Sequence, residues 1–219
     1  MTAELDLDAG LAALGARGGA AAMLPHGARA QLLAYIELLA KWNRTYNLTA
    51  IREPERMVTH HVLDALAVLP HLCAATAGPE MRLLDVGSGG GVPAIPLAIA
   101  RPLWHVVALD SSHKKGAFLQ QAVIELALPN AEAVIGRVED YASSAPFDVV
   151  IARAFSDLAT FAEKGARHLA PGGRLVAMKG VFPDEEVAHL PPAFRVVAAP
   201  GLKVPGLHAE RHLIVMERT

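Results

Sequence analysis

From about residue 79 onward, short runs of apolar residues alternate with amphipathic stretches. Alternation of this kind is typical of β-α units, in which parallel strands are buried on both faces of a sheet. The pattern predicts seven strands, at 81–86, 104–110, 131–136, 147–152, 173–178, 194–199 and 211–217. We therefore expect an α/β fold built on a seven-stranded, mostly parallel sheet.

The part of the chain before this region follows a helical pattern instead. Leu32, Ile36 and Leu39 recur at helical spacing, and a second apolar stripe of the same kind runs through residues 58–72. Both stripes predict amphipathic helices that bury one face against the rest of the protein.

Residues 1–27 are rich in alanine and glycine, with breakers at Gly18-Gly19 and Pro25 between short helical pieces. No repeat and no low-complexity linker separates the helical part from the alternating part. We expect an N-terminal helical extension, residues 1–78, that packs on a core domain, residues 79–219.

Composition narrows the class of protein. With 53% hydrophobic and 19% charged residues among 219, the chain can bury a sizeable core. Its one cysteine, Cys73, excludes an internal disulfide and suits a reducing cytoplasm. No stretch approaches the length of a membrane span, and the acidic start is unlike a secretory signal, so we expect a cytoplasmic protein without a membrane partner. We also expect a monomer. A net charge of −2 argues against a general nucleic-acid binder, although it allows a local basic face.

The most informative segment is 83–93, an apolar strand that ends in an acid and continues into a glycine loop. Its bare backbone comes from three glycines, Gly87, Gly89 and Gly91. A cofactor can lie against such a loop, and a dinucleotide fingerprint would need a further glycine where Val92 stands. The G-x-G-x-G spacing directly after Asp85 resembles motif I of the S-adenosylmethionine-dependent methyltransferases. The competing interpretation is an ordinary glycine-rich turn.

The second predicted strand ends in Asp110. In an open α/β sheet, ligands bind outside the carboxyl ends of the strands, and a carboxylate there can accept both hydroxyls of a cofactor ribose. An acid that ends a strand is about as often the N-cap of the next helix. The distance from the glycine loop favours the ligand interpretation.

Polar side chains also follow the third and fourth predicted strands. Glu139 and Asp140 stand where methyltransferases usually meet the adenine, although acids in such a loop can simply cap the next helix. Arg153 ends the fourth strand, and an arginine at the mouth of a buried strand needs an anionic partner. That partner is a cofactor carboxylate, an RNA phosphate or a neighbouring acid.

The methyl acceptor is inferred from what the chain lacks. Enzymes that methylate amino groups of adenine or cytosine carry an [Asn/Asp]-Pro-Pro-aromatic motif after the fourth strand, where this chain has Ala-Arg-Ala-Phe at 152–155. Methylation of pyrimidine C5 needs a thiolate, and Cys73 lies upstream in a helical stretch. His60 and His61 are adjacent and point apart on a helix, so we predict no metal site. Guanine N7 has a free lone pair and no proton, so its methylation needs only positioning and desolvation.

Six segments share a further likeness. They are Trp42–Thr49, His61–Asp64, Asp85–Pro93, Ala152–Phe155, Lys179-Gly180 and Glu210–Leu213. Together they resemble the bacterial small-subunit (16S) ribosomal RNA guanine-N7 methyltransferases, a family also called glucose-inhibited division protein B. The resemblance runs from about residue 28 to the C-terminus, and the Trp-Asn-x-x-Tyr-Asn-Leu-Thr block makes it specific.

The resemblance implies a class I (Rossmann-like) methyltransferase that uses S-adenosylmethionine and acts on 16S ribosomal RNA or the small ribosomal subunit. The implied acceptor is N7 of a guanosine in the 530 loop region. By motif position, the family's cofactor contacts fall on Gly87, Val92, Val138, Glu139 and Arg153, of which Arg153 is also the catalytic candidate. The RNA side falls on His61, Lys179, Arg211 and His212.

The chain departs from the family at three positions. His60 replaces a common arginine, Ala65 replaces a serine, and Ala94 replaces a glycine. These changes weaken the RNA assignments more than the cofactor assignments.

A basic and aromatic segment lies between residues 41 and 56. Its cations are Lys41, Arg44, Arg52 and Arg56. They outnumber the acids there, and with Trp42 and Tyr46 interleaved they suit phosphate contacts and base stacking, which adds Arg44 to the RNA candidates. The alternative is that both aromatic rings anchor the helices to the sheet.

Three functions remain open. The leading hypothesis is a ribosomal RNA guanine-N7 methyltransferase, and the second is a methyltransferase for a small metabolite with the same cofactor. The third is a non-catalytic RNA-binding assembly factor that kept the fold. The intact glycine loop with Asp85 and Asp110 argues against the third, because an inactive site has no need for those residues.

Overall fold

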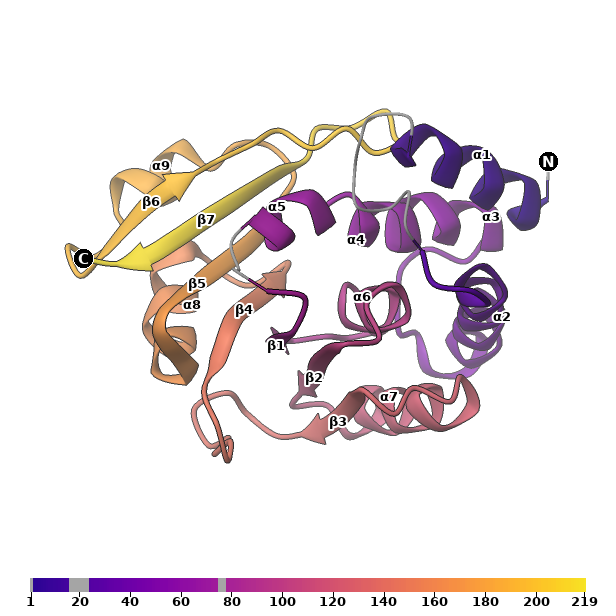
Figure 1. Ribbon diagram of the computed structural model, residues 1–219, viewed down its shortest axis with the longest axis horizontal. Coiled ribbons are helices and arrows are strands. Elements are labelled where there is room, and N and C mark those ends of the chain that lie inside the picture. Colours follow the sequence, from indigo (N-terminus) through magenta and orange to yellow (C-terminus); the bar gives the residue numbers. More distant parts are fainter. Residues whose placement is uncertain (1, 16–23, 75–77) are drawn as a thin grey trace.

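A seven-stranded sheet forms the centre of the protein in a computed structural model that describes residues 2–15, 24–74 and 78–219. Its strands lie in the order β3-β2-β1-β4-β5-β7-β6, and β7 runs antiparallel to both of its neighbours (Figure 1). The chain moves outward from β1 to β2 and β3, then returns to place β4 on the other side of β1. This order creates a switch point between β1 and β4, where open α/β sheets bind ligands.

The strands confirm the expected sheet closely. They are β1 (Met81–Val86), β2 (Trp104–Asp110), β3 (Ala131–Ile135), β4 (Phe147–Arg153), β5 (Leu169–Lys179), β6 (Phe194–Ala198) and β7 (His212–Arg218). The main difference is β5, which begins before the predicted residue 173. Leu169 already pairs with Phe147, and the register then shifts so that Arg174 pairs with Val149. The intervening Pro-Gly-Gly segment is an irregularity within the strand rather than a turn before it.

Helices cover both faces of the sheet (Figure 1). One face carries α6 (Ala94–Ala100) and α7 (His113–Glu125), together with the N-terminal helices. The other face carries α8 (Leu158–Gly165), the short 3-10 turn η3 (Ala166–His168) and α9 (Asp184–Ala188). This division follows from topology, because right-handed crossovers change face when the direction of strand addition reverses.

Successive residues of the central strands alternate between two hydrophobic cores. Leu83, Val106 and Val149 belong to the core beneath α6 and α7. Their neighbours Leu84 and Val107 belong to the core beneath α8. Because side chains of a strand point to opposite faces in turn, a run that is apolar at every position fits only a sheet covered on both sides.

The N-terminal helices extend the first of these cores. They are α1 (Ala3–Gly15), α2 (Ala28–Tyr46), α3 (Pro54–Met57), a π-helical turn η2 (Val58–Leu63), α4 (Asp64–Leu66) and α5 (Leu69–Ala74). The two predicted helical stripes are therefore confirmed, although the second begins earlier and contains a π-turn. Leu39 of α2 and Leu66 of α4 share one cluster with Ile95 of α6. The predicted breaker Gly18-Gly19 lies outside the described residues.

The expectation that no stretch approaches the length of a membrane span is wrong. Residues Pro54–Ala74 form a helical stretch that is long and apolar enough to cross a membrane by length and composition alone. About two thirds of its most apolar window, 67%, is buried inside the protein, where it packs against α1 and α6. Its apolar residues are therefore those of a helix in the hydrophobic core.

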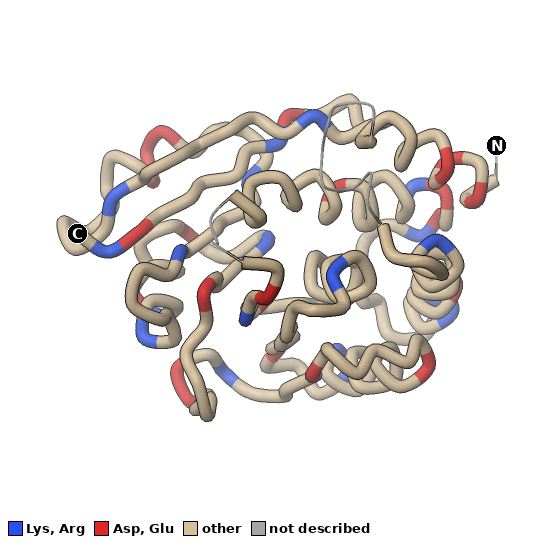
Figure 2. Tube along the Cα trace, viewed as in Figure 1, with Lys and Arg blue, Asp and Glu red and all other residues tan. Residues whose placement is uncertain are grey.

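Charged residues are spread along the whole trace, with acids and bases interspersed (Figure 2). This distribution agrees with the small net charge of −2.

Candidate functional site

A cavity of about 410 Å³ opens at the carboxyl ends of β1, β2 and β4. It is lined by Val86, Gly87, Leu109, Asp110, Ser111, Lys115, Gly136, Arg137, Val138, Glu139, Ala154, Phe155 and Lys164. These residues come from the ends of β1 and β2, from the loops after β1 to β4, and from α7 and α8, so the cavity occupies the position that the sheet topology favours for a ligand.

Gly87 forms the floor of the cavity beside β1. Its φ is +75°, and its N–H donates to the Leu109 carbonyl at 2.8 Å, which joins the loop to β2. A Cβ at this position would meet no atom within 4 Å, so a side chain would project into open space. The bare backbone therefore leaves room for a flat ligand group, which fits the predicted cofactor.

The other loop glycines serve the loop itself. Gly89 donates its N–H to Asp110 Oδ2 at 2.9 Å. A Cβ on Gly91 would stand 2.6 Å from Ile95 Cγ1, so this glycine permits close packing of the loop on α6. Neither glycine nor the buried Val92 is among the residues that line the cavity, so their direct cofactor contacts stay predictions. Pro93 stands at the N-cap of α6, directly before its first helical residue.

Asp110 lies at the edge of the cavity and is nearly buried. Its Oδ2 accepts from Gly89 N and its Oδ1 accepts from Ser112 N, both at 2.9 Å. The N-cap of α7 is Ser112, so Asp110 does not take the helix-capping role that the sequence left open. A carboxylate has about four lone-pair sites, so both oxygens can still accept from a ligand.

Asp85 is fully buried beneath the glycine loop. Its Oδ2 accepts from Ala94 N at 3.2 Å, whereas its Oδ1 has no hydrogen-bond partner among the described residues. Burial raises the pKa of Asp85 from 3.8 to about 7, against the smaller opposing effect of its hydrogen bonds. Asp85 therefore sits close to its titration point near neutral pH.

The loop after β3 is held by contacts from α8 and η3. Lys164 Nζ pairs with Glu139 Oε1 at 2.5 Å, and Arg167 donates to the Glu139 carbonyl at 2.6 Å. The His168 ring lies 2.9 Å from the Val138 carbonyl through Nε2. Within residues 136–146, all of which the structure describes, no helix follows β3, so Glu139 and Asp140 do not cap one. Val138 and Glu139 line the cavity.

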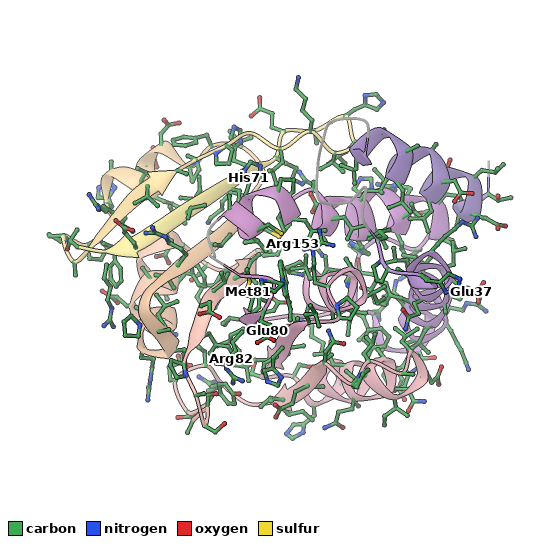
Figure 3. All side chains as sticks on the ribbon, viewed as in Figure 1. Glu37, His71, Glu80, Met81, Arg82 and Arg153 are labelled. Atoms are coloured by element: carbon green, nitrogen blue, oxygen red, sulfur yellow. The ribbon has the colours of Figure 1, made fainter. Side chains whose placement is uncertain are left out.

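Arg153 ends β4 and lies between the sheet and the helical layer, as labelled in Figure 3. Its guanidinium NH1 is 3.5 Å from Asp64 Oδ2 and donates to the His60 carbonyl at 2.9 Å. A neighbouring acid is therefore one partner of this arginine, as the sequence allowed. The side chain keeps 28% of its surface exposed, but Arg153 is not among the residues that line the cavity, so its contact with a cofactor or an RNA anion stays a prediction.

Ala154, directly after Arg153, has a φ of +58° and lines the cavity. Left-handed backbone is unusual for a residue with a Cβ and is found disproportionately at functional sites.

Three RNA candidates lie together where β5 ends and β7 begins. Lys179, at the end of β5, is the register partner of His212, at the start of β7, and Arg211 is its neighbour in sequence. Lys179 pairs with Glu186 Oε2 at 2.7 Å, and His212 Nδ1 lies 2.8 Å from the Gly180 carbonyl. Their RNA contacts stay predictions, as does that of Arg44, an exposed residue in the last turn of α2.

His61 has a different environment from the one expected. It is only 3% exposed and lies inside the π-turn η2, with Nε2 3.0 Å from Thr49 Oγ1. Burial, aided by the Arg153 charge, lowers the pKa of His61 to about 3. A buried, neutral imidazole is not placed for an RNA phosphate, so the structure gives His61 an internal role.

The Trp42–Thr49 block mainly serves the fold. Trp42 packs edge-on against Phe118 of α7, with ring centroids 5.7 Å apart. Asn43 is buried and bonds to both Thr49 N and the Ile51 carbonyl, which shapes the turn after α2. Tyr46 is 44% exposed and Trp42 is partly exposed, so Tyr46 offers the more accessible surface for a base.

Tyr35 of α2 is a contact to the glycine loop that sequence reasoning missed. It is fully buried, and its hydroxyl donates to the Gly90 carbonyl at 2.6 Å. Burial raises its pKa. Its place within the apolar stripe of α2 was the only available signal, and that signal indicates packing alone.

Comparison with known proteins identifies the family. The model of the family described as rRNA small subunit methyltransferase G matches residues 28–214. Ribosomal RNA small subunit methyltransferase G from Nitrosospira multiformis is 53% identical over 197 residues, covering 87% of this chain and 88% of that protein. The protein of the same name from Laribacter hongkongensis is 52% identical over 214 residues, covering 98% of each.

Solved structures support the fold alone. The glycopeptide N-methyltransferase MtfA is similar with a TM-score of 0.60 and 15% identity, covering 73% of this chain and 92% of that one. TrmN from Thermus thermophilus is similar with a TM-score of 0.53 and 21% identity, covering 74% of this chain and 53% of that one. The architecture is that of the class I S-adenosylmethionine-dependent methyltransferases. By the extent of the family match and the identity to its curated members, the chain belongs to the rRNA small subunit methyltransferase G family.

Proposed function

We propose that this ribosomal RNA methyltransferase transfers a methyl group from S-adenosylmethionine to N7 of a guanosine in the 530 loop region of 16S RNA. Membership of the family supports the RNA substrate. The observation that carries the proposal is the position of Lys179 and Arg211, at the end of β5 and just before β7, where the cavity end of the sheet lies. Cations there suit a polyanionic substrate brought to a bound cofactor.

The cavity residues fit the cofactor. Gly87 offers bare backbone, Asp110 offers carboxylate oxygens to ribose hydroxyls, and the Val138-Glu139 segment offers backbone and carboxylate groups to adenine. Arg153 is the candidate for the cofactor carboxylate, because its charge acts on Asp85 beneath the glycine loop and its side chain is 28% exposed. When bound, S-adenosylmethionine supplies a methyl group activated by a sulfonium sulfur.

The chain's part in the reaction is mainly positioning. Guanine N7 attacks with its own lone pair and loses no proton, so no general base is required of the protein. The cavity walls exclude water, and the cationic edge aligns the RNA so that N7 faces the methyl group. We further infer that the enzyme works as a monomer in the cytoplasm, which suits its single cysteine.

Transfer of a labelled methyl group tests this function. Purified protein is incubated with labelled S-adenosylmethionine and small ribosomal subunits from a strain that lacks the modification, with naked 16S RNA as a second substrate. We expect label in the 16S RNA from at least one of the two. No label in either, together with label in a small metabolite fraction, would point to the metabolite hypothesis. Calorimetry without cofactor binding would revive the assembly-factor hypothesis.

A further inference from the structure

One buried carboxylate holds two arginines from distant parts of the chain. Asp64 is 1% exposed, and its Oδ1 accepts from Arg211 Nε at 3.1 Å while its Oδ2 lies 3.5 Å from Arg153 NH1. Asp64 begins α4 in the helical layer, Arg153 ends β4, and Arg211 immediately precedes β7. Asp64 thus joins the helical layer to the end of the sheet at which the cavity opens.

A second set of contacts holds the same arginine from the π-turn. The His60 carbonyl accepts from Arg153 NH1 and from the His61 ring nitrogen Nδ1, each at 2.9 Å. With the proton on Nδ1, His61 Nε2 accepts from the Thr49 hydroxyl, whose oxygen in turn accepts from Ile51 N at 3.2 Å. With this tautomer both ring nitrogens and the Thr49 hydroxyl have partners, whereas Arg153 NH1 and NH2, which lie 3.4 and 3.5 Å from Nδ1, make no hydrogen bond to the ring. The series runs from the backbone near the Trp42–Thr49 block to the guanidinium.

These contacts reduce the freedom of a long side chain. A free arginine loses about 2 kcal/mol of rotamer entropy when it is fixed, and contacts made before the ligand arrives reduce the share lost on binding. Burial raises the pKa of Asp64 despite both guanidinium groups, and the three side chains together carry an excess of positive charge. The cluster of Asp64, Arg153 and Arg211 is therefore both rigid and attractive to an anion.

We propose that Asp64 is a positioning residue that fixes Arg153 for the carboxylate of the cofactor, with His61 and Thr49 supporting the same guanidinium. This inference rests on the proposed function in one respect, namely that Arg153 meets the cofactor. It assigns to the helical layer a role in the cofactor site, where the family resemblance alone suggested RNA contact for His61.

A double-mutant cycle on S-adenosylmethionine affinity tests the proposal. Asp64→Asn keeps the shape of the side chain and removes its charge, and we expect the Kd to rise about tenfold by calorimetry. In an Arg153→Ala background the same change should alter the Kd less than about twofold, because Asp64 acts through Arg153. Additive losses in the two backgrounds would overturn the proposal, as would an unchanged Kd in folded Asp64→Asn.

Two further variants separate positioning from general damage to the fold. Asp148→Asn, at the opposite end of β4, removes a carboxylate that accepts from Arg82 N at 2.8 Å, and we expect no change in Kd. An equal loss of affinity there would overturn the proposal. If Asp64→Asn fails to fold, Thr49→Val carries the test, since it preserves every charge; we expect an approximately threefold rise in Kd that disappears in Arg153→Ala. Because the cycle measures binding, a wild-type protein that shows this coupling yet methylates no RNA would contradict the proposed function alone.

Discussion

The cofactor edge and the arginine junction are built in different ways. The cofactor edge is made of Gly87 and the carboxylates Asp85 and Asp110, which stand at the ends of adjacent strands. The arginine junction is the contact of Asp64 with Arg153 and Arg211, and Asp64 and Arg211 are 147 positions apart in sequence. The first uses hydrogen bonds between the loop and its neighbouring strand; the second exists only because the helical layer packs on the sheet. Substitutions at the cofactor edge should therefore act locally, whereas those at the junction should depend on one another.

The largest effect is expected for Asp85→Asn, measured as stability against pH. The pKa of Asp85 is raised from 3.8 to about 7 in the folded protein, so between these values the folded state keeps a proton that the unfolded state releases. The unfolding free energy should consequently fall as pH rises through this window. At pH 8 the variant should be more stable than wild type by up to about 4 kcal/mol, at about 1.36 kcal/mol for each pKa unit.

Denaturant unfolding at several pH values measures this difference. The variant should lose the decline that Asp85 causes between about pH 4 and pH 7. Curves for wild type and variant that run parallel across the window would show that Asp85 is ionised in the fold, and that the cofactor edge carries no buried neutral acid.

Asp110→Ala should give the next largest effect, on cofactor binding. The change removes a carboxylate from the cavity wall and releases Gly89 N and Ser112 N, so we expect about a 100-fold higher Kd for S-adenosylmethionine. Calorimetry gives the affinity, and thermal melting gives the control. Melting that loses its cooperativity would make Asp110 a structural residue instead, whereas a cooperative melt with unchanged Kd would remove it from the site.

Arg153→Ala tests the arginine junction. We expect kcat/KM for methyl transfer to 16S RNA to fall about 30-fold, with RNA affinity within about threefold of wild type. The reason is that Arg153 lies beside the glycine loop and Asp85, whereas Lys179 and His212 lie farther along the sheet edge. Filter binding measures RNA affinity, and initial rates on the same subunits measure methyl transfer. A larger loss of RNA affinity than of turnover would assign Arg153 to the RNA side.

The smallest effect is expected for a substitution at Ala154, directly after β4. Ala154 has a φ of +58°, a conformation that glycine adopts without strain, so Ala154→Gly should leave the unfolding free energy unchanged or raise it by up to about 1 kcal/mol. Ala152→Gly, within β4, is the control, and there we expect a loss of about 1 kcal/mol in a buried strand position. Equal losses at both sites would mean that the left-handed backbone at Ala154 carries no strain.

The two regions also differ in how far the sequence could predict them. The strand ends that carry Asp85, Gly87 and Asp110 follow from apolar runs of the right length and from local turn chemistry, and the structure bears out their placement. The early start of β5 was missed because an irregularity with four unpaired positions interrupts its pattern.

The junction was less accessible to sequence reasoning. The sequence around Arg153 and around the His61–Asp64 segment is the same whether these side chains face solvent or each other. His61 was therefore predicted on the RNA side, and only the packing of η2 against Arg153 and Thr49 shows it buried. The π-turn itself has no sequence signature at this length. The environment of these residues thus depends on contacts over long sequence separations, which local sequence patterns do not reveal.

Mass-spectrometric mapping of the methylated nucleotide tests the central claim most directly. Small subunits that lack the modification are incubated with the protein and S-adenosylmethionine, and the 16S RNA is digested and sequenced by mass. We predict one additional 7-methylguanosine, located in the 530 loop region. A methyl group on another atom or in another region of the RNA, or none at all, would contradict the account.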